Sequence, residues 1–229
     1  MRIDKLAILV LAGMVAAAQA TAQVGEEGFV QLFDGKSLDG WQRRGGQSTY
    51  RVEDGAIVGS FADAKRNTFL CTGKSFGDFI LRLEFKLEAG NSGVQFRSAA
   101  RQNADGSESV FGYQAEIAAT PERVARIYDE GRRGFKFDRI WLDNTAPERL
   151  ERSAAAYKKG DWNNLEVQCV GPSIRTWLNG VPVVDFFDDA DLSGFIGLQV
   201  HAIKNPDGGV CARWRNIRIK DLGVSRWKP

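Results

Sequence analysis

The stretch that decides the fold is Asn91-Ser92-Gly93-Val94-Gln95-Phe96-Arg97. Its Asn and Gly favour a turn, and the residues that follow alternate between apolar and polar. Successive side chains of a strand point to opposite faces, so Val94 and Phe96 share one face and Gln95 and Arg97 share the other. The apolar pair predicts contact with a core. The polar pair could bind a polar ligand on the opposite face.

The same alternation recurs along most of the chain. In residues 80–87 every second side chain is apolar, while Glu84 lies on the other face between two basic residues. Residues 111–117 and 194–201 repeat this division, and turn dipeptides such as Asn179-Gly180 separate the strands. Short strands with almost no helix predict an all-β fold, a sandwich of two antiparallel sheets that each bury one face.

The first 22 residues predict a cleavable signal peptide. A charged start precedes an apolar run at residues 6–18, and the small residues at 20–22 suit a signal peptidase. The run is too short for a permanent membrane span, and the alternative is a buried N-terminal helix. We therefore expect a periplasmic or secreted protein with no membrane attachment after cleavage. Residues 23–229 then form a single domain, because no linker divides them.

Charge and cysteine content narrow the function further. The formal net charge is +2, which gives no global basic field for nucleic acid. The three cysteines, Cys71, Cys169 and Cys211, allow at most one disulfide. Their strand-like surroundings make buried thiols at least as good an interpretation as a bridge.

Outward polar residues of several strands form the candidate site. If these strands lie in one sheet, their exposed sides create one polar surface of the size of a carbohydrate. For each residue the alternative is an ordinary solvated side chain or half of a weak ion pair. Tyr128 and Trp141 could stack on a sugar ring or simply pack. The outward set is Glu84, Gln95, Arg97, Gln114, Glu116, Gln199 and His201, the only histidine.

Several familiar sites are absent from the sequence. No Cys and His cluster has the spacing of a zinc site, no glycine-rich loop precedes Lys and Ser or Thr, and no nucleophile elbow is present. Glu84 and Glu88 stand four residues apart without the intervening Asp of laminarinase-type glycosidases. We expect no cofactor. The alternative is a divalent ion held by Glu84, Glu116 and His201.

An ordered series of short motifs runs through nearly the whole mature chain, from about residue 29 to 222. The clearest are Leu32-Phe33-Asp34-Gly35, Asn91-Ser92-Gly93, Gly112-Tyr113-Gln114, Trp162-Asn163, Trp177-Leu178-Asn179-Gly180, Gln199 with His201, and Arg215-Asn216-Ile217. The series resembles the 3-keto-disaccharide hydrolase domain family. This resemblance implies a concanavalin A-like jelly-roll sandwich whose concave sheet binds sugar. It also implies activity on glycosides already oxidised to a ketone at carbon 3.

A ketone at carbon 3 acidifies the hydrogen on carbon 2, so a base can remove that hydrogen while the group on carbon 1 leaves. Addition of water to the resulting enone then gives net hydrolysis. The alternative is a non-catalytic carbohydrate-binding, lectin-like domain on the same sandwich. The expected roles are Glu84 or Glu116 as base, His201 as proton donor to the leaving group, Arg97 with Gln95 or Gln199 at the enolate oxygen, and Asn91, Gln114 and Tyr128 as further sugar contacts.

Overall fold

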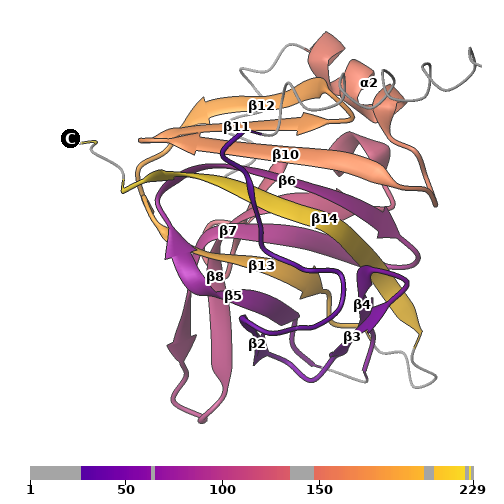
Figure 1. The fold of residues 1–229 in the computed structure, drawn as a ribbon, viewed down its shortest axis with the longest axis vertical. Helices are drawn as coiled ribbons and strands as arrows, with labels where there is room; N and C mark the ends of the chain where they lie inside the picture. Colours follow the sequence, from indigo (N-terminus) through magenta and orange to yellow (C-terminus); the bar gives the residue numbers. More distant parts are fainter. Residues whose placement is uncertain (1–26, 63–64, 135–146, 204–208, 225–226, 228–229) are drawn as a thin grey trace, which may run out of the picture.

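The computed structural model describes residues 27–62, 65–134, 147–203, 209–224 and 227. The signal peptide predicted for residues 1–22 and the stacking residue Trp141 lie outside these ranges. Within them, two antiparallel sheets face each other, as the alternating strands predicted (Figure 1). The fold is therefore an all-β sandwich, and that prediction is confirmed.

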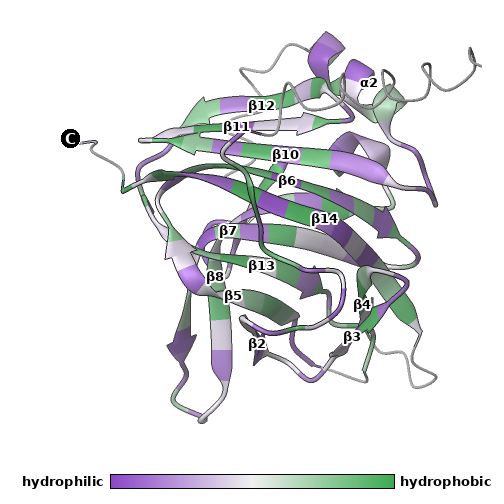
Figure 2. Cartoon of the chain, viewed as in Figure 1, coloured by the Kyte–Doolittle hydropathy of each residue, from purple (hydrophilic) through white to green (hydrophobic). Residues whose placement is uncertain are grey.

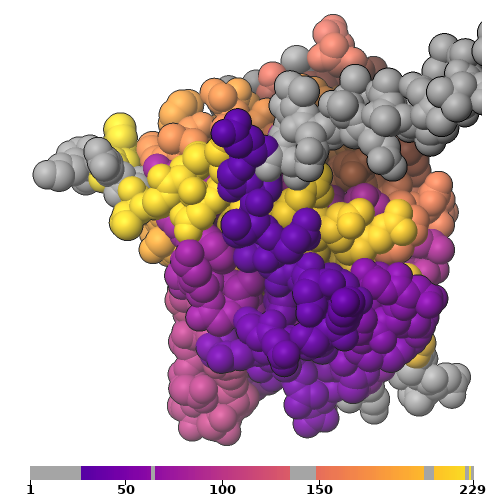
Figure 3. Space-filling view, in the orientation of Figure 1, coloured from indigo at the N-terminus to yellow at the C-terminus, as the bar shows by residue number. Residues whose placement is uncertain are grey.

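The larger sheet has the order β12-β11-β10-β6-β14-β4-β3, and β1 pairs separately with β14. In the space-filling view the N-terminal segment lies against the C-terminal strand, in accord with the pairing of Val30 with Ile219 (Figure 3). The strands of the larger sheet are β1 (Val30–Gln31), β3 (Thr49–Glu53), β4 (Ala56–Ser60), β6 (Asp78–Leu87), β10 (Asn163–Val170), β11 (Ser173–Leu178), β12 (Val181–Phe187) and β14 (Val210–Gly223).

The smaller sheet has the order β2-β5-β13-β7-β8-β9. A 3-10 helix η1 (Pro121–Arg123) joins its last two strands, and an α-helix α2 (Pro147–Ala156) precedes β10. The strands of this sheet are β2 (Trp41–Gly45), β5 (Thr68–Phe76), β7 (Asn91–Gln102), β8 (Glu108–Ala118), β9 (Ile127–Glu130) and β13 (Gly194–Val200).

The core lies between the two sheets and is built from the apolar face of each. Apolar and polar residues alternate along the strands, as the hydropathy colouring shows (Figure 2). Phe79 of β6 and Phe96 of β7 meet edge to face across the core, with ring centroids 6.5 Å apart. Val94 is also fully buried there. The predicted inward direction of Val94 and Phe96 is confirmed, so Gln95 faces away from the core.

A bulge in β7 changes the direction of Arg97. The pairing with β8 shifts between Phe96 and Ala99, and Arg97 has φ +45°. Its guanidinium is buried, donating to the Gly77 carbonyl at 3.0 Å and the Gly171 carbonyl at 2.6 Å and pairing with Asp78 at 3.0 Å. The expectation that Arg97 shares a face with Gln95 is wrong, because the bulge breaks the period of two.

The three cysteines are buried and none forms a disulfide. Burial raises the pKa of Cys169 and of Cys211 to about 12, and it also raises that of Cys71. The buried-thiol interpretation is therefore confirmed. No helix in the part of the chain described here is long and apolar enough to cross a bilayer.

Candidate functional site

The outer face of the six-stranded sheet gathers polar side chains from four neighbouring strands, β13, β7, β8 and β9. Their alternate residues, among them Tyr113, Ala115 and Leu198, fill the core on the other side of the same sheet. Register fixes the order of the polar residues. The cross-strand partners are Gln199 with Gly93, Gly93 with Glu116, Gln95 with Gln114, and Gln114 with Tyr128.

Glu116 is the most enclosed carboxylate of this face, with 6% of its surface exposed. Asn91 Nδ2 donates to its Oε1 at 2.6 Å and Gln114 Nε2 donates to its Oε2 at 2.8 Å. Burial raises its pKa, while these two amides and the charges of His201 and Arg123 act in the opposite direction. A buried carboxylate with a raised pKa is a candidate general base.

A chain of hydrogen bonds continues from Glu116 under the surface of the sheet. Gln95 Nε2 donates to Gln114 Oε1 at 2.9 Å, and Ser98 Oγ donates to Gln95 Oε1 at 2.6 Å. Gly93 makes room for it, since a Cβ there would stand only 2.3 Å from Gln114 Cδ. Gln95 and Gln114 are both buried, and each side chain uses its amide nitrogen and its amide oxygen in this chain.

Glu130, at the end of β9, is a second carboxylate on this face. Asn67 Nδ2 donates to its Oε1 at 3.1 Å, and Gln199 Nε2 donates to its Oε2 at 3.3 Å. Burial raises the pKa of Glu130 to about 7, and the negative charge of Glu116 adds to the rise. Sequence reasoning missed Glu130 and Asn67. The available signal was the spacing of two from Tyr128, which repeats the spacing of Gln114 and Glu116 on the neighbouring strand.

Tyr128 and Gln199 complete the surroundings of the two carboxylates. Burial raises the pKa of Tyr128, followed by the negative charges of Glu130, Glu116 and Asp129. Gln199 is 1% exposed, and its Oε1 accepts no hydrogen bond from the residues that the structure describes. This oxygen therefore keeps acceptor capacity that no described residue uses.

A cavity of about 260 Å³ opens beside Glu130. Asn67 and Glu130 supply polar groups to its lining, and Phe69 and Val110 supply apolar ones. The two apolar residues belong to a small cluster on this face, separate from the main core. Apolar surface beside a few fixed polar groups is the usual composition of a small-molecule site.

The loop after β9 holds Glu130 in place. Asp129 is fully buried and accepts hydrogen bonds from the guanidinium groups of Arg132, at 2.9 Å, and Arg133. Arg132 also pairs with Asp191 at 2.5 Å, and Arg133 pairs with Asp188 at 2.7 Å. These ion pairs bind the basic loop to the segment before β13.

Glu84 does not belong to this site. It lies on β6 in the other sheet, where Arg215 Nε donates to its Oε2 at 2.7 Å and Asn216 Nδ2 donates to its Oε1 at 2.5 Å. The expectation that Glu84 shares one surface with Glu116 is wrong. Alternation predicts on which face of a strand a residue lies, but not to which sheet the strand belongs. The ion site of Glu84, Glu116 and His201 is therefore not assembled. Among the described residues, no group of three or more His, Cys, Asp or Glu could hold a metal ion.

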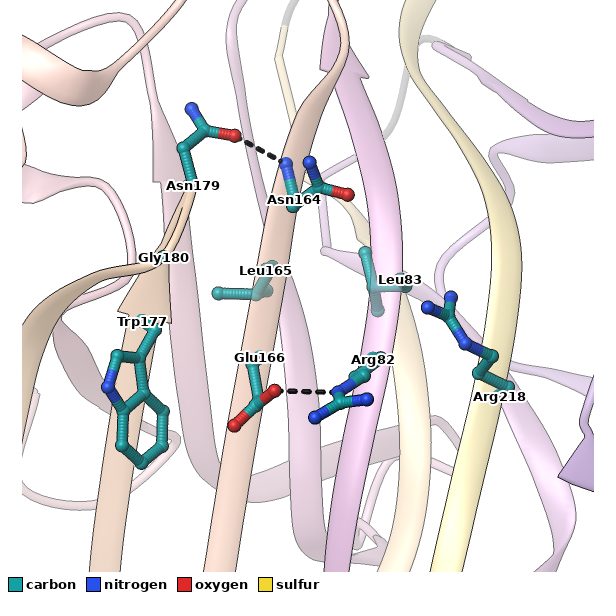
Figure 4. A pocket seen from close by; sticks show the side chains of 9 residues that line it. All are labelled: Arg82, Leu83, Asn164, Leu165, Glu166, Trp177, Asn179, Gly180 and Arg218. Carbon is teal, nitrogen blue, oxygen red and sulfur yellow. Dashed lines mark hydrogen bonds and ion pairs between the residues drawn. The ribbon is translucent and has the colours of Figure 1, made fainter. Parts of the chain in front are cut away.

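The outer face of the larger sheet carries a different cavity, of about 340 Å³ (Figure 4). A row of side chains crosses four strands there, formed by Trp177, Glu166, Arg82 and Arg218. Arg82 Nε donates to Glu166 Oε2 at 2.7 Å, so this carboxylate is half of an ion pair. The row lacks the buried pair of carboxylates found on the smaller sheet. The outer face of the smaller sheet is therefore the candidate site.

Of the remaining predicted residues, the structure brings Asn91, Gln95, Gln114, Glu116, Tyr128 and Gln199 together on one sheet. His201 follows β13 directly and is half-buried, and its charge acts on Glu116. It therefore lies at the margin of the group.

Solved structures share this fold. A candidate glycosyl hydrolase from Parabacteroides distasonis superposes with a TM-score of 0.57 at 20% sequence identity, over 86% of this chain and 95% of that one. A Bacillus subtilis protein of unknown function with a galectin-like fold superposes with a TM-score of 0.50 at 14% identity, over 83% of this chain and 94% of that one. No curated protein sequence matches the chain.

A sequence model of one family covers most of the chain. It matches residues 28–220, from just before β1 into β14, and so includes both sheets and every residue of the candidate site. This agrees with the resemblance that the ordered motifs indicated. The chain belongs to the family of the 3-keto-alpha-glucoside-1,2-lyase-like domain.

Proposed function

We propose that this protein is an exported carbohydrate-active enzyme that cleaves the glycosidic bond of 3-keto-glycosides. The observation that carries the proposal is the pair of enclosed carboxylates, Glu116 and Glu130, on adjacent strands of one face. Both have a raised pKa, and that of Glu130 is about 7. Groups poised near neutral pH are suited to general acid and base catalysis.

The proposed reaction is an elimination across carbons 1 and 2 followed by hydration. Glu116, as the carboxylate, removes the proton from carbon 2, and the electrons of that bond form the double bond to carbon 1. The bond from carbon 1 to the glycosidic oxygen breaks, and protonated Glu130 gives its proton to that oxygen. Water then adds across the enone. Glu130 thus takes the role that the sequence assigned to His201, and the amide of Gln199 remains a sugar contact.

The test is incubation of the purified protein with a panel of 3-keto-disaccharides, with the products identified by mass spectrometry. We expect loss of substrate and release of the sugar from carbon 1. Glu116→Gln removes the base and should lower kcat at least about 100-fold. Glu84→Gln is the matched control, since Glu84 lies on the other sheet, and it should keep near-full activity. Wild-type protein that leaves the whole panel intact would refute the proposal.

A carbohydrate-binding domain without catalysis is the second candidate. The observation in its favour is that both oxygens of Glu116 already accept amide hydrogen bonds. Binding alone would raise the melting temperature with an unmodified sugar and leave every 3-keto substrate unchanged.

Export rests on the N-terminal sequence pattern alone. We propose a periplasmic or secreted location, in which case the protein recovered from that fraction begins near Gln23.

A further inference from the structure

We propose that Ser98, Gln95 and Gln114 form a hydrogen-bond relay that holds Glu116 as the anion, and that Gly93 supplies the space for it. They are thus positioning residues rather than sugar ligands. The inference deepens the proposed function and rests on it for its catalytic meaning. It gives the two buried carboxylates unequal tasks, with Glu116 as base and Glu130 as acid.

The direction of the relay follows from its two ends. An ionised carboxylate can only accept, so Gln114 presents its amide nitrogen to Glu116 and its oxygen to Gln95. Gln95 must then present its own nitrogen, which leaves its oxygen for the hydroxyl of Ser98. A hydroxyl can donate, so every contact in the series is satisfied, at 2.8, 2.9 and 2.6 Å. Bonds that point the same way polarise one another and strengthen the last one.

Glu130 has weaker support. Its two amide contacts are 3.1 and 3.3 Å long, against 2.6 and 2.8 Å at Glu116. Short hydrogen bonds to a charged acceptor are the stronger ones. When one proton is shared between two neighbouring carboxylates, it therefore resides on Glu130. Among the charged groups that act on Glu116, His201 and Arg123 both favour its anion. Tyr128, on β9, interacts with both carboxylates.

Gln95 can be tested apart from substrate contact. It is fully buried, and among the residues that the structure describes its amide hydrogen-bonds with Gln114 and Ser98. Gln95→Met keeps its length and removes both polar atoms. Gly93→Ala displaces Gln114 by steric overlap and removes no polar group, so it disturbs the relay independently. The matched controls are Gln42→Met, at an exposed position of β2, and Gly73→Ala, at an exposed position of β5 where a Cβ would stand 3.4 Å from the Gly40 carbonyl oxygen.

The measurement is a carbon-13 NMR titration of labelled Glu carboxyl groups, assigned with Glu116→Gln and Glu130→Gln. In wild-type protein we expect Glu116 to titrate below Glu130. Gln95→Met and Gly93→Ala should each raise the Glu116 midpoint by roughly half a pH unit or more, and the controls should not. The acidic limb of the kcat/KM profile should move equally.

Two outcomes would overturn the relay. One is a folded Gln95→Met protein with an unmoved Glu116 midpoint, and the other is a wild-type protein in which Glu130 ionises first. The NMR result needs no substrate, so it separates the two proposals. A shifted midpoint in a protein without turnover would overturn the proposed function and leave the relay intact.

Discussion

At the scale of single residues, the enclosed Glu130 opposes folding above the pH at which a free carboxyl ionises. Its pKa rises from 4.5 to about 7 in the folded chain, chiefly because burial disfavours the charged form. Between these two pH values the unfolded chain has released the proton that the folded chain keeps. The free energy of unfolding therefore falls as pH rises through this window, and is greatest below it.

Glu130→Gln should remove this part of the pH dependence. The shift is equivalent to about 3 kcal/mol between pH 4.5 and 7. The variant should thus be more stable than wild type at pH 7.5 and gain little at pH 4.5, as measured by urea unfolding at both pH values. Glu122→Gln, at an exposed position of η1, is the control. Equal gains in stability for Glu130→Gln at both pH values would show that ionisation of Glu130 does not destabilise the folded chain.

At the scale of elements, the bulge of β7 connects the smaller sheet to two turns of the larger one. Arg97 reaches the turn between β5 and β6 through Gly77 and Asp78, and the turn between β10 and β11 through Gly171. Asp78 Oδ1 also accepts from the Gly171 backbone nitrogen at 2.9 Å. One buried side chain thus joins both turns at the same end of the sandwich.

Arg97→Met should be strongly destabilising, because it removes the Arg97 donor from two carbonyls and leaves the Asp78 carboxylate without its ion-pair partner. We expect a loss of about 3 kcal/mol in the free energy of unfolding. The protein that remains folded should keep its kcat, since Arg97 does not lie on the site face. Arg101→Met, at an exposed position of the same strand, should cost under about 0.5 kcal/mol. A lower kcat in stable, folded Arg97→Met protein would show that Arg97 contributes to the site after all.

The sequence predicted the strands and their apolar faces better than it predicted which strands lie side by side. Alternation is a local property, so it correctly assigned Val94 and Phe96 to the core. Two things depend on contacts between distant segments. The sheet to which Glu84 belongs is set by the pairing of β6 with β10 and β14. The direction of Arg97 is set by a bulge, and no residue type in the sequence indicates that bulge.

The site shows the same limit. Gln95, Gln114, Glu116 and Gln199 could be found because each lies in a long alternating strand. Glu130 ends a strand of four residues beside a basic loop, so its sequence surroundings resemble a solvated turn. Its raised pKa comes from burial among groups of other strands. These groups are distant in the sequence, so the sequence does not indicate that they surround Glu130.

At the scale of the whole molecule, no disulfide links the two sheets, because all three cysteines are free thiols. Cys71 lies under the site face, and Cys169 and Cys211 lie in the main core. Burial raises the pKa of all three thiols, so each stays neutral and unreactive in the folded chain.

A reducing agent should therefore leave the melting temperature unchanged. A thiol reagent should label none of the three cysteines at pH 8 in the native state and all three in urea, as counted by intact mass. Cys169→Ser, which removes a buried apolar thiol without opening a disulfide, should lower the stability in oxidising and reducing buffer alike. A melting temperature that falls only on reduction would show a disulfide.

Gly93 also bears on how other members of the family are interpreted. A side chain at this position would overlap a glutamine placed as Gln114 is, and the carboxylate of Glu116 would then lose one of its two amide donors. On the proposed relay, a side chain at this position therefore marks relatives whose carboxylate lacks that support. Genome-scale annotation could apply that distinction directly, before any protein is purified.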